Sequence, residues 1–308
     1  GCLGVVTSAV IRLQPLPEVV EYQSILFAEW PTGVAFMRGV GSLTAALRPA
    51  SCRLMDNKQL RMAQAIKGGK AHGDWRSVLK MAYLHASGIN MDTAVAATLV
   101  FEGSRDEVRL QRQAVTKLAR QAGGLWAGAQ SGEAGYALTF AIAYLRDFGL
   151  DHSILSESFE TMAPWSCVHR VWPEVVAAVE REHAAFRLPG RPALSCRMTQ
   201  LYSEGAVLYM YLAIAVGNLA PDTALKVFTH LEHTARQAVL AAGGSLSHHH
   251  GVGQLRASFM PQMQSDIAAT GMQGLKAAWD PQNVLGLRNG VWAQAAQHQP
   301  QGDKDSAH

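Results

Sequence analysis

The spacing of apolar residues changes period several times along the first half of the chain. Runs with an apolar residue at every second position are typical of strands, and apolar residues three or four positions apart are typical of helices. The pattern predicts strands over residues 4–13, 21–30, 49–55 and 93–102. It predicts helices over residues 31–47, in segments reaching His85 with a break at Gly68-Gly69, and over 106–122, where Gly123-Gly124 ends the helix.

The second half continues this mixture of strands and helices. Strands are predicted over 153–161, 194–202 and 206–216, the last two joined as a hairpin about Ser203-Glu204-Gly205, and helices over 135–148, 164–186 and 221–242. Two more helical stretches lead to Asp280-Pro281, and residues 291–308 are expected to form a disordered tail. Because strands and helices do not alternate regularly, the pattern predicts an α+β fold rather than repeated βαβ units.

Composition narrows the class of protein without naming a function. Of 308 residues, 48% are hydrophobic and 17% are charged, a globular balance that excludes a disordered chain, a collagen-like repeat and a disulfide miniprotein. The sequence has no uninterrupted run of 18 apolar residues, so no membrane-spanning helix is predicted. The net charge of +3 is spread along the chain, so we expect no nucleic-acid partner. The sequence contains no GxGxxG, GxxxxGK[ST], HExxH or GxSxG motif, which removes the common nucleotide, zinc-protease and serine-hydrolase interpretations.

The cysteines are few and widely spaced. None of them forms a CxxC pair, which disfavours a metal knuckle and a secreted disulfide framework; they are Cys2, Cys52, Cys167 and Cys196. We therefore expect reduced thiols in an intracellular compartment.

Three consecutive histidines, His248, His249 and His250, stand inside the glycine-framed segment GGSLSHHHGVG. A metal site would need further ligands, and none has suitable spacing nearby, so no metal is expected. A solvated turn remains an alternative. Glycines allow close backbone approach, and clustered imidazoles can bind an anion or move protons.

Two arginines and a tyrosine pair are further candidates. Arg53 ends a short predicted strand, and Arg146 ends an apolar helical stretch beside Asp147. Each arginine can pair with a neighbouring carboxylate or bind a phosphate through its guanidinium. Tyr209 and Tyr211 share one face of a predicted strand, where they either pack in the core or supply a general acid or base to a cavity.

The candidate residues lie in blocks that resemble a known family. GCLGVVTSAVIRLQPLPE resembles the strand that closes the FAD-binding domain of vanillyl-alcohol-oxidase-type flavoproteins. Six later blocks occur in the order found in the alkyldihydroxyacetonephosphate synthase family, over residues 1–290: SCRLMDNKQ, LVFEGSRDEV, AYLRDFGLDHSILSESFETMAPW, SCRMTQLYSEGAVLYMY, GGSLSHHHGVGQLR and DPQNVLGLRN.

The resemblance implies an FAD-dependent transferase of ether-lipid synthesis. It implies exchange of the acyl group of acyl-dihydroxyacetone phosphate for a long-chain fatty alcohol, without net redox change, through an adduct with N5 of the reduced flavin. It also implies a peroxisomal location. Peripheral association with a membrane and a homodimer are further expectations from the resemblance. The C-terminal Ser-Ala-His does not match a peroxisomal signal.

The same resemblance assigns roles to individual residues. Tyr209 matches the catalytic tyrosine, which would remove a proton next to the ketone, and the triplet of His248, His249 and His250 matches a required histidine triplet. Arg146 matches the substrate-binding arginine, and Arg53 matches a second arginine required for activity. A flavin-contacting segment is matched by Gly1, Cys2, Leu3, Gly4, Val5 and Val6.

The resemblance also implies a domain organisation. Residues 1–18 would be the end of an FAD-binding PCMH-type domain, 19–244 an antiparallel-sheet cap domain flanked by helices, and 245–290 a segment that packs back on the flavin site. The chain would then be the C-terminal part of a longer protein. Two alternatives remain: a flavin oxidase or dehydrogenase acting on a 2-hydroxy acid or phenol, and a non-catalytic lipid-binding fragment.

Overall fold

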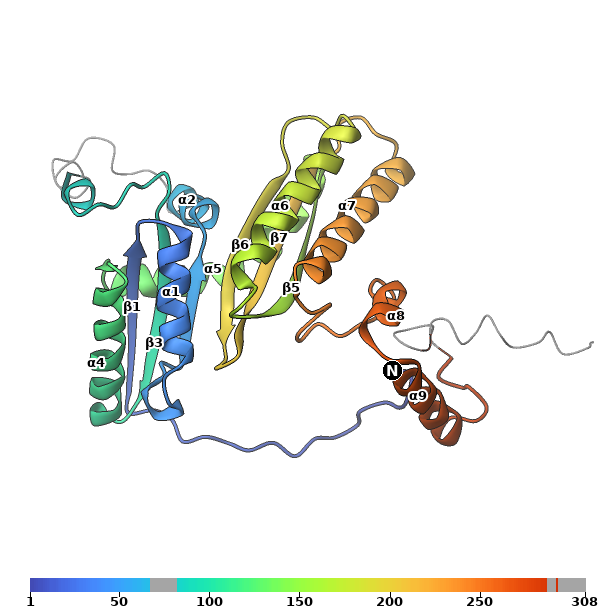
Figure 1. The fold of residues 1–308 in the computed structure, drawn as a ribbon, viewed down its shortest axis with the longest axis horizontal. Helices are drawn as coiled ribbons and strands as arrows, with labels where there is room; N and C mark the ends of the chain where they lie inside the picture. The colour runs from blue at the N-terminus through green and yellow to red at the C-terminus, as the bar shows by residue number, and fades with distance from the viewer. Residues whose placement is uncertain (67–81, 287–291, 293–308) are drawn as a thin grey trace, which may run out of the picture. The chain divides into compact units, whose positions relative to one another are not determined.

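The computed structural model describes residues 1–66, 82–286 and 292 (Figure 1). The chain divides into two units: residues 16–248 form one, and residues 1–15 with 249–308 form the other. The expected helix break at Gly68-Gly69, and the expected tail apart from Trp292, lie outside the described residues.

In the described part of the unit of residues 16–248, seven strands form one antiparallel sheet, in the order β4-β1-β3-β2-β6-β7-β5. The strands are β1 (Val19–Phe27), β2 (Ser51–Met55), β3 (Val95–Gly103), β4 (Leu125–Trp126), β5 (Ile154–Pro164), β6 (Ala193–Leu201) and β7 (Gly205–Ala215). The expected hairpin is confirmed as β6 and β7, and β5 pairs with β7 along its whole length.

Helices cover this sheet in two pairs. The helices of this unit are α1 (Trp30–Gly41), η1 (Ala45–Leu47), α2 (Asn57–Ile66), α4 (Arg105–Gln121), α5 (Ala129–Asp151), α6 (Val168–Ala185) and α7 (Pro221–Ala241). Figure 1 shows α1 and α4 against β1 and β3, and α6 over β6 and β7 with α7 beside α6, while α5 lies behind the sheet and contacts β1 and β5.

The core lies between the sheet and the paired helices. In β7, Leu208, Met210 and Leu212 are buried, whereas the intervening Tyr209 and Tyr211 are only partly buried. Because successive strand side chains point to opposite faces, burying the leucines in the core directs both tyrosines to the other face. One face of the hairpin therefore packs in the core, and the other face, which carries the tyrosines, can form a site.

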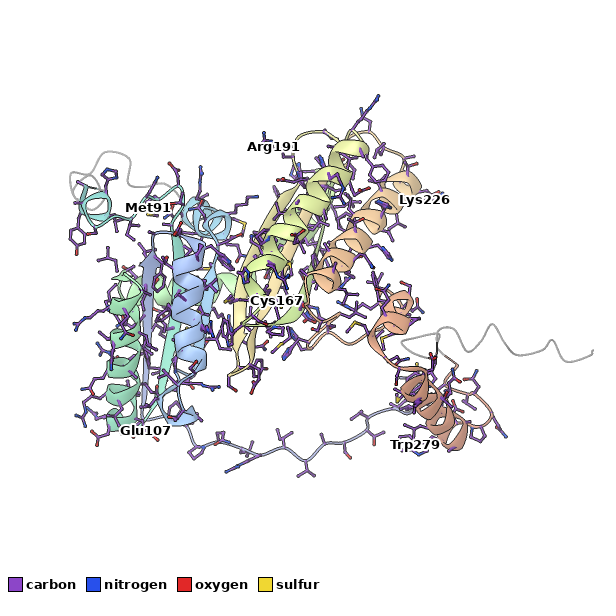
Figure 2. All side chains as sticks on the ribbon, viewed as in Figure 1. Met91, Glu107, Cys167, Arg191, Lys226 and Trp279 are labelled. Carbon is purple, nitrogen blue, oxygen red and sulfur yellow. The ribbon has the colours of Figure 1, made fainter. Side chains whose placement is uncertain are left out.

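The helix ends show why the sequence signals were informative. The Ser104 hydroxyl and the Glu107 carboxylate cap the start of α4 reciprocally. Gly243 follows α7 with a φ of +91°, a conformation that favours glycine and is typical of a residue just past a helix end. Cys167, labelled in Figure 2, precedes α6, and its Sγ lies 3.4 Å from the Gly243 carbonyl oxygen. This contact links the start of α6 to the end of α7.

Two predicted elements are wrong. Residues 4–13 form no strand, and Val10 is fully exposed, since no neighbouring strand among the described residues completes their backbone hydrogen bonds. The helix expected from Pro164 begins at Val168, and Pro164 instead ends β5 opposite Gly205. β5 is an edge strand, where a proline without a backbone N–H is tolerated.

The predicted α+β fold class, with an antiparallel sheet flanked by helices, is confirmed. All four cysteines are buried and none is in a disulfide. Within the described ranges, no helix has the length and apolar character needed to span a membrane.

The second unit consists of an extended N-terminal segment and short helices. Its helices are η2 (Ala257–Phe259), α8 (Met260–Met263) and α9 (Asp266–Trp279). Lys276 on α9 donates to the Cys2 carbonyl oxygen (2.7 Å) and to the Asp280 carboxylate (2.6 Å). These bonds hold the start of the chain against the end of α9.

Candidate active site

A cavity of about 700 Å³ opens on the polar side of β5, β6 and β7. Lys58, Arg146 and Arg197 bring positive charge to its lining, and Glu157 brings a carboxylate. Apolar side chains form much of the remaining wall; they include Met62, Phe148, Ile154, Ala193 and Ala213. The cavity therefore combines cations suited to an anionic group with surface suited to a hydrocarbon chain.

Tyr209 and Tyr211 line this cavity together with Arg197. The two rings are 5.3 Å apart between centroids, and the Arg197 Cζ lies 5.1 Å from the Tyr209 centroid and 5.4 Å from that of Tyr211. The Tyr209 hydroxyl is 3.2 Å from the Ser158 hydroxyl. Of the two alternatives for these tyrosines, the structure selects a cavity wall rather than the core.

Strand register places a carboxylate and a cation on either side of Tyr209. Glu160 on β5 and Arg197 on β6 are both directly opposite Tyr209 on β7. Residues paired in this way share a face of the sheet, with Cβ atoms about 4.5–5.5 Å apart. The phenol therefore lies in a row of three polar side chains across the sheet.

Burial shifts the pKa values of Arg197, in this row, and of Tyr211 beside it. Burial lowers the pKa of Arg197, and the nearby positive charge of Arg53 lowers it further. Burial also raises the pKa of the Tyr211 phenol to about 12. The Nε of Arg197 has no hydrogen-bond partner among the described residues. The guanidinium is thus partly desolvated, and its Nε–H is enclosed by the protein.

The two arginines predicted from sequence take different places. Arg146, near the end of α5, lines the cavity with 58% of its side chain exposed, and its Nε is 3.8 Å from the Asp147 carboxylate. Arg53 lies on β2 close enough to Arg197 and Tyr211 to affect the pKa of both. The structure therefore places Arg146 and Tyr209 in the lining of one cavity, and Arg53 near two of its lining residues, Arg197 and Tyr211.

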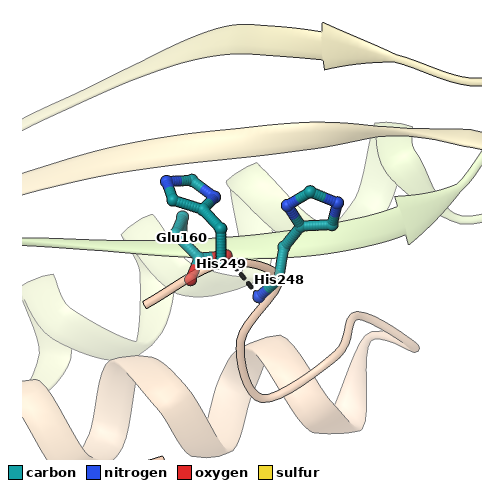
Figure 3. A group of neighbouring side chains, drawn as sticks. All are labelled: Glu160, His248 and His249. Atoms are coloured by element: carbon teal, nitrogen blue, oxygen red, sulfur yellow. Dashed lines mark hydrogen bonds between the residues drawn. The ribbon is translucent and has the colours of Figure 1, made fainter. Parts of the chain in front are cut away.

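His248 is held at its backbone and at its ring, and Figure 3 shows the backbone bond to Glu160. Its backbone N–H donates to a Glu160 carboxylate oxygen (2.6 Å), and its Nε2 lies 3.0 Å from the Tyr202 hydroxyl. Glu160 and His248 belong to a group whose ligand atoms lie within 4.8 Å of one another, close enough to hold a metal ion. The expectation of no metal stays a prediction.

The remaining predicted residues belong to the other unit. His249 and His250 follow the boundary, with ring centroids 4.5 Å apart. Of the predicted flavin-contacting segment, Cys2 is buried, while Val5 and Val6 are exposed. A Cβ on Gly4 would meet no atom within 4 Å. Open backbone of this kind fits a segment that contacts a cofactor, and its flavin role stays a prediction.

Sequence reasoning did not find Arg197, Glu160 or Ser158. A signal for two of them was present: Ser156, Ser158 and Glu160 occupy every second position of β5 and form a polar strand face. The place of Arg197 depends on its pairing with β7, which no local pattern specifies.

A comparison with protein families matches residues 16–287 to the C-terminal domain of FAD-linked oxidases. The chain belongs to this family. This membership confirms the prediction that the chain is part of a flavoprotein and that the cofactor of its family is FAD.

Individual proteins are similar to this chain in sequence or in fold. The chain is 39% identical over 294 residues to alkyldihydroxyacetonephosphate synthase of Caenorhabditis elegans, covering 94% of this chain and 48% of the relative. A solved alkyldihydroxyacetonephosphate synthase matches the fold with a TM-score of 0.69 at 20% identity, covering 92% of this chain and 47% of that one. The 4-ethylphenol oxidase of Gulosibacter chungangensis matches with a TM-score of 0.63 at 12% identity, covering 93% and 56%. The chain thus spans about half the length of the synthases that it matches.

Proposed function

We propose that this chain supplies the substrate-binding part of an alkyldihydroxyacetonephosphate synthase. The observation that carries the proposal is the cavity, which places Tyr209 between cations and an apolar wall. An acyl-dihydroxyacetone phosphate has the matching parts, namely a phosphate, a ketone and a hydrocarbon chain. The 39% sequence identity to the Caenorhabditis elegans synthase also favours a synthase over a flavin oxidase.

In this proposal the cations of the cavity bind the phosphate. Arg197 offers a partly desolvated guanidinium near Tyr209, and Arg146 and Lys58 add charge at the lining. Arginine binds phosphate oxygens through strong, directional hydrogen bonds. The apolar residues of the wall would hold the acyl chain and then the alkyl chain.

Tyr209 is the proposed proton acceptor. Its hydroxyl oxygen lies 3.2 Å from that of Ser158, and the Arg197 Cζ lies 5.1 Å from its ring centroid. As the acceptor, Tyr209 would act as the phenolate and become the phenol when it takes up the proton. The proton comes from the carbon next to the ketone. The ester C–O bond then breaks, and the fatty acid leaves as a carboxylate. The alcohol oxygen forms the new ether bond at the same carbon as the alcohol gives up its proton, and that carbon takes back a proton in place of the one removed.

The histidines and the N-terminal segment complete the proposal. His248, His249 and His250 would supply positive charge and protons to the departing carboxylate and the entering alcohol. Gly1, Cys2, Leu3, Gly4, Val5 and Val6 would contact FAD, and Arg53 would balance negative charge there. FAD, when bound, supplies a reversible covalent partner for the ketone carbon. A peroxisomal location, a membrane surface for lipid access and a homodimer belong to the same proposal.

The test is a product balance. The smallest active form of the protein that contains these 308 residues is incubated with acyl-dihydroxyacetone phosphate and a fatty alcohol. We expect equal amounts of alkyl-dihydroxyacetone phosphate and fatty acid, with no hydrogen peroxide and no consumption of an electron acceptor. Peroxide formed in step with product would indicate an oxidase instead.

A further inference from the structure

The segment that leads into the histidine triplet is bound to the edge strand β5 by a continuous set of hydrogen bonds. The Ser245 N–H donates to the Met162 carbonyl oxygen (2.9 Å), and the Ser245 hydroxyl accepts from the Met162 N–H (3.0 Å). The Thr161 hydroxyl donates to the Ser245 carbonyl oxygen (2.7 Å). These contacts set the direction in which the chain leaves α7.

Glu160 makes the last contacts before the triplet. One carboxylate oxygen accepts from the Ser247 hydroxyl and the other from the His248 N–H, each at 2.6 Å. Glu160 is 1% exposed, so its carboxylate is removed from bulk water. Hydrogen bonds to a buried charged acceptor are short and strong, and a neutral side chain cannot replace both.

The position of Glu160 relates this anchor to the cavity. Glu160 is directly opposite Tyr209 in the pairing of β5 with β7. The carboxylate that holds the His248 backbone therefore belongs to the nearest strand neighbour of the proposed proton acceptor. On the other side, the Tyr202 hydroxyl holds the His248 ring.

We propose that Glu160 is a positioning residue, which fixes the Ser247–His248 backbone to β5 and so places the His248 imidazole relative to Tyr209. Neither the resemblance nor the relatives' names assign it this role. The structural claim stands apart from the proposed function, and only its kinetic consequence rests on that function.

The structural claim is tested by hydrogen exchange, followed by mass spectrometry on this chain, in peptides covering residues 245–250. We expect Glu160→Ala to accelerate exchange there by at least about tenfold, equal to about 1.4 kcal/mol, without changing peptides from the centre of α7. Glu160→Gln keeps one acceptor and should give an intermediate rate. Glu204→Ala, which removes an exposed carboxylate at the β6–β7 turn, is the matched control and should match the wild type.

Further variants keep the test decisive. If Glu160→Ala fails to fold, Ser247→Ala removes one of the two bonds and should also accelerate exchange. Rates within about twofold of the wild type for both Glu160→Gln and Ser247→Ala would overturn the anchor, since a lost charged hydrogen bond changes exchange more than that.

The kinetic arm uses the active form. We expect Glu160→Gln to lower kcat by about fivefold or more while KM for both substrates changes by less than about twofold, because a displaced imidazole affects the reaction more than binding. Faster exchange with unchanged kcat would overturn the positioning role. If the wild type performs no acyl-for-alkyl exchange, the proposed function fails, while the hydrogen-exchange result still decides the anchor.

Discussion

Removing the positive charge of Arg197 should weaken binding of the phosphorylated substrate far more than removing that of Arg146. Both side chains line the same cavity, and each can be replaced by methionine, which keeps an unbranched chain of similar length. They differ in solvent exposure: Arg197 is partly buried with an enclosed Nε, and 58% of the Arg146 side chain is exposed. Comparing the two variants therefore shows how burial of an arginine changes the strength of its contact with the substrate phosphate.

The expected magnitudes follow from that difference. A hydrogen bond to a charged group contributes about 1.5–3 kcal/mol, so Arg197→Met should raise KM for acyl-dihydroxyacetone phosphate by about 10- to 150-fold. Ion pairs of exposed side chains contribute about 0.2–1 kcal/mol, so Arg146→Met should raise it by at most about fivefold. The free energy of unfolding of Arg197→Met should stay within about 1 kcal/mol of the wild type, since the lost cation–π contacts are offset by removal of a buried charge.

The assay measures KM for each substrate separately, with urea unfolding as a check on the fold. KM for the fatty alcohol should change little in either variant, because the alcohol has no anionic group. Equal effects of the two variants on the phosphorylated substrate would refute the reasoning. So would a rise in KM for the alcohol as large as that for the phosphorylated substrate in Arg197→Met.

Three further predictions concern the reaction and the stability of the fold. Tyr209→Phe should abolish the exchange reaction with an unchanged circular dichroism spectrum, since only a hydroxyl is removed; normal turnover would exclude Tyr209 as the proton acceptor. Leu208→Ala removes a fully buried side chain and should lower the free energy of unfolding by about 2–5 kcal/mol in a urea titration, and a loss below about 1 kcal/mol would contradict its place in the core. Burial raises the pKa of Asp56 from 3.8 to about 6, so the folded chain holds this proton more tightly than the unfolded chain. Its contribution to stability is therefore present below about pH 4 and is lost, by up to about 3 kcal/mol, as the pH rises through 6. Asp56→Asn should remove that slope from urea titrations between pH 4 and 7, and a slope that persists would contradict the assignment.

Local patterns determined the elements whose signals lie within a few residues. The hairpin of β6 and β7 follows from alternation on both sides of Ser203-Glu204-Gly205, and the end of α7 follows from a glycine that adopts a positive φ. The same patterns failed where a distant partner decides the outcome. Residues 4–13 have the apolar and β-branched composition of a strand but no neighbour to pair with among the described residues. Pro164 is accommodated because β5 is an edge strand.

The sequence by itself determined the α+β class, the family and the identities of Tyr209, Arg146, Arg53 and the histidines as candidates, because short motifs and periodicity carry that information. Only the tertiary structure decided which side chains surround Tyr209. Glu160 lies 49 positions before Tyr209 in the sequence, and Arg197 comes from the neighbouring strand, yet strand pairing places each directly opposite the phenol. Register is fixed by burial of the opposite face of the sheet, where Leu208 and Met210 meet the helices, and that burial is a property of the whole fold rather than of any one segment.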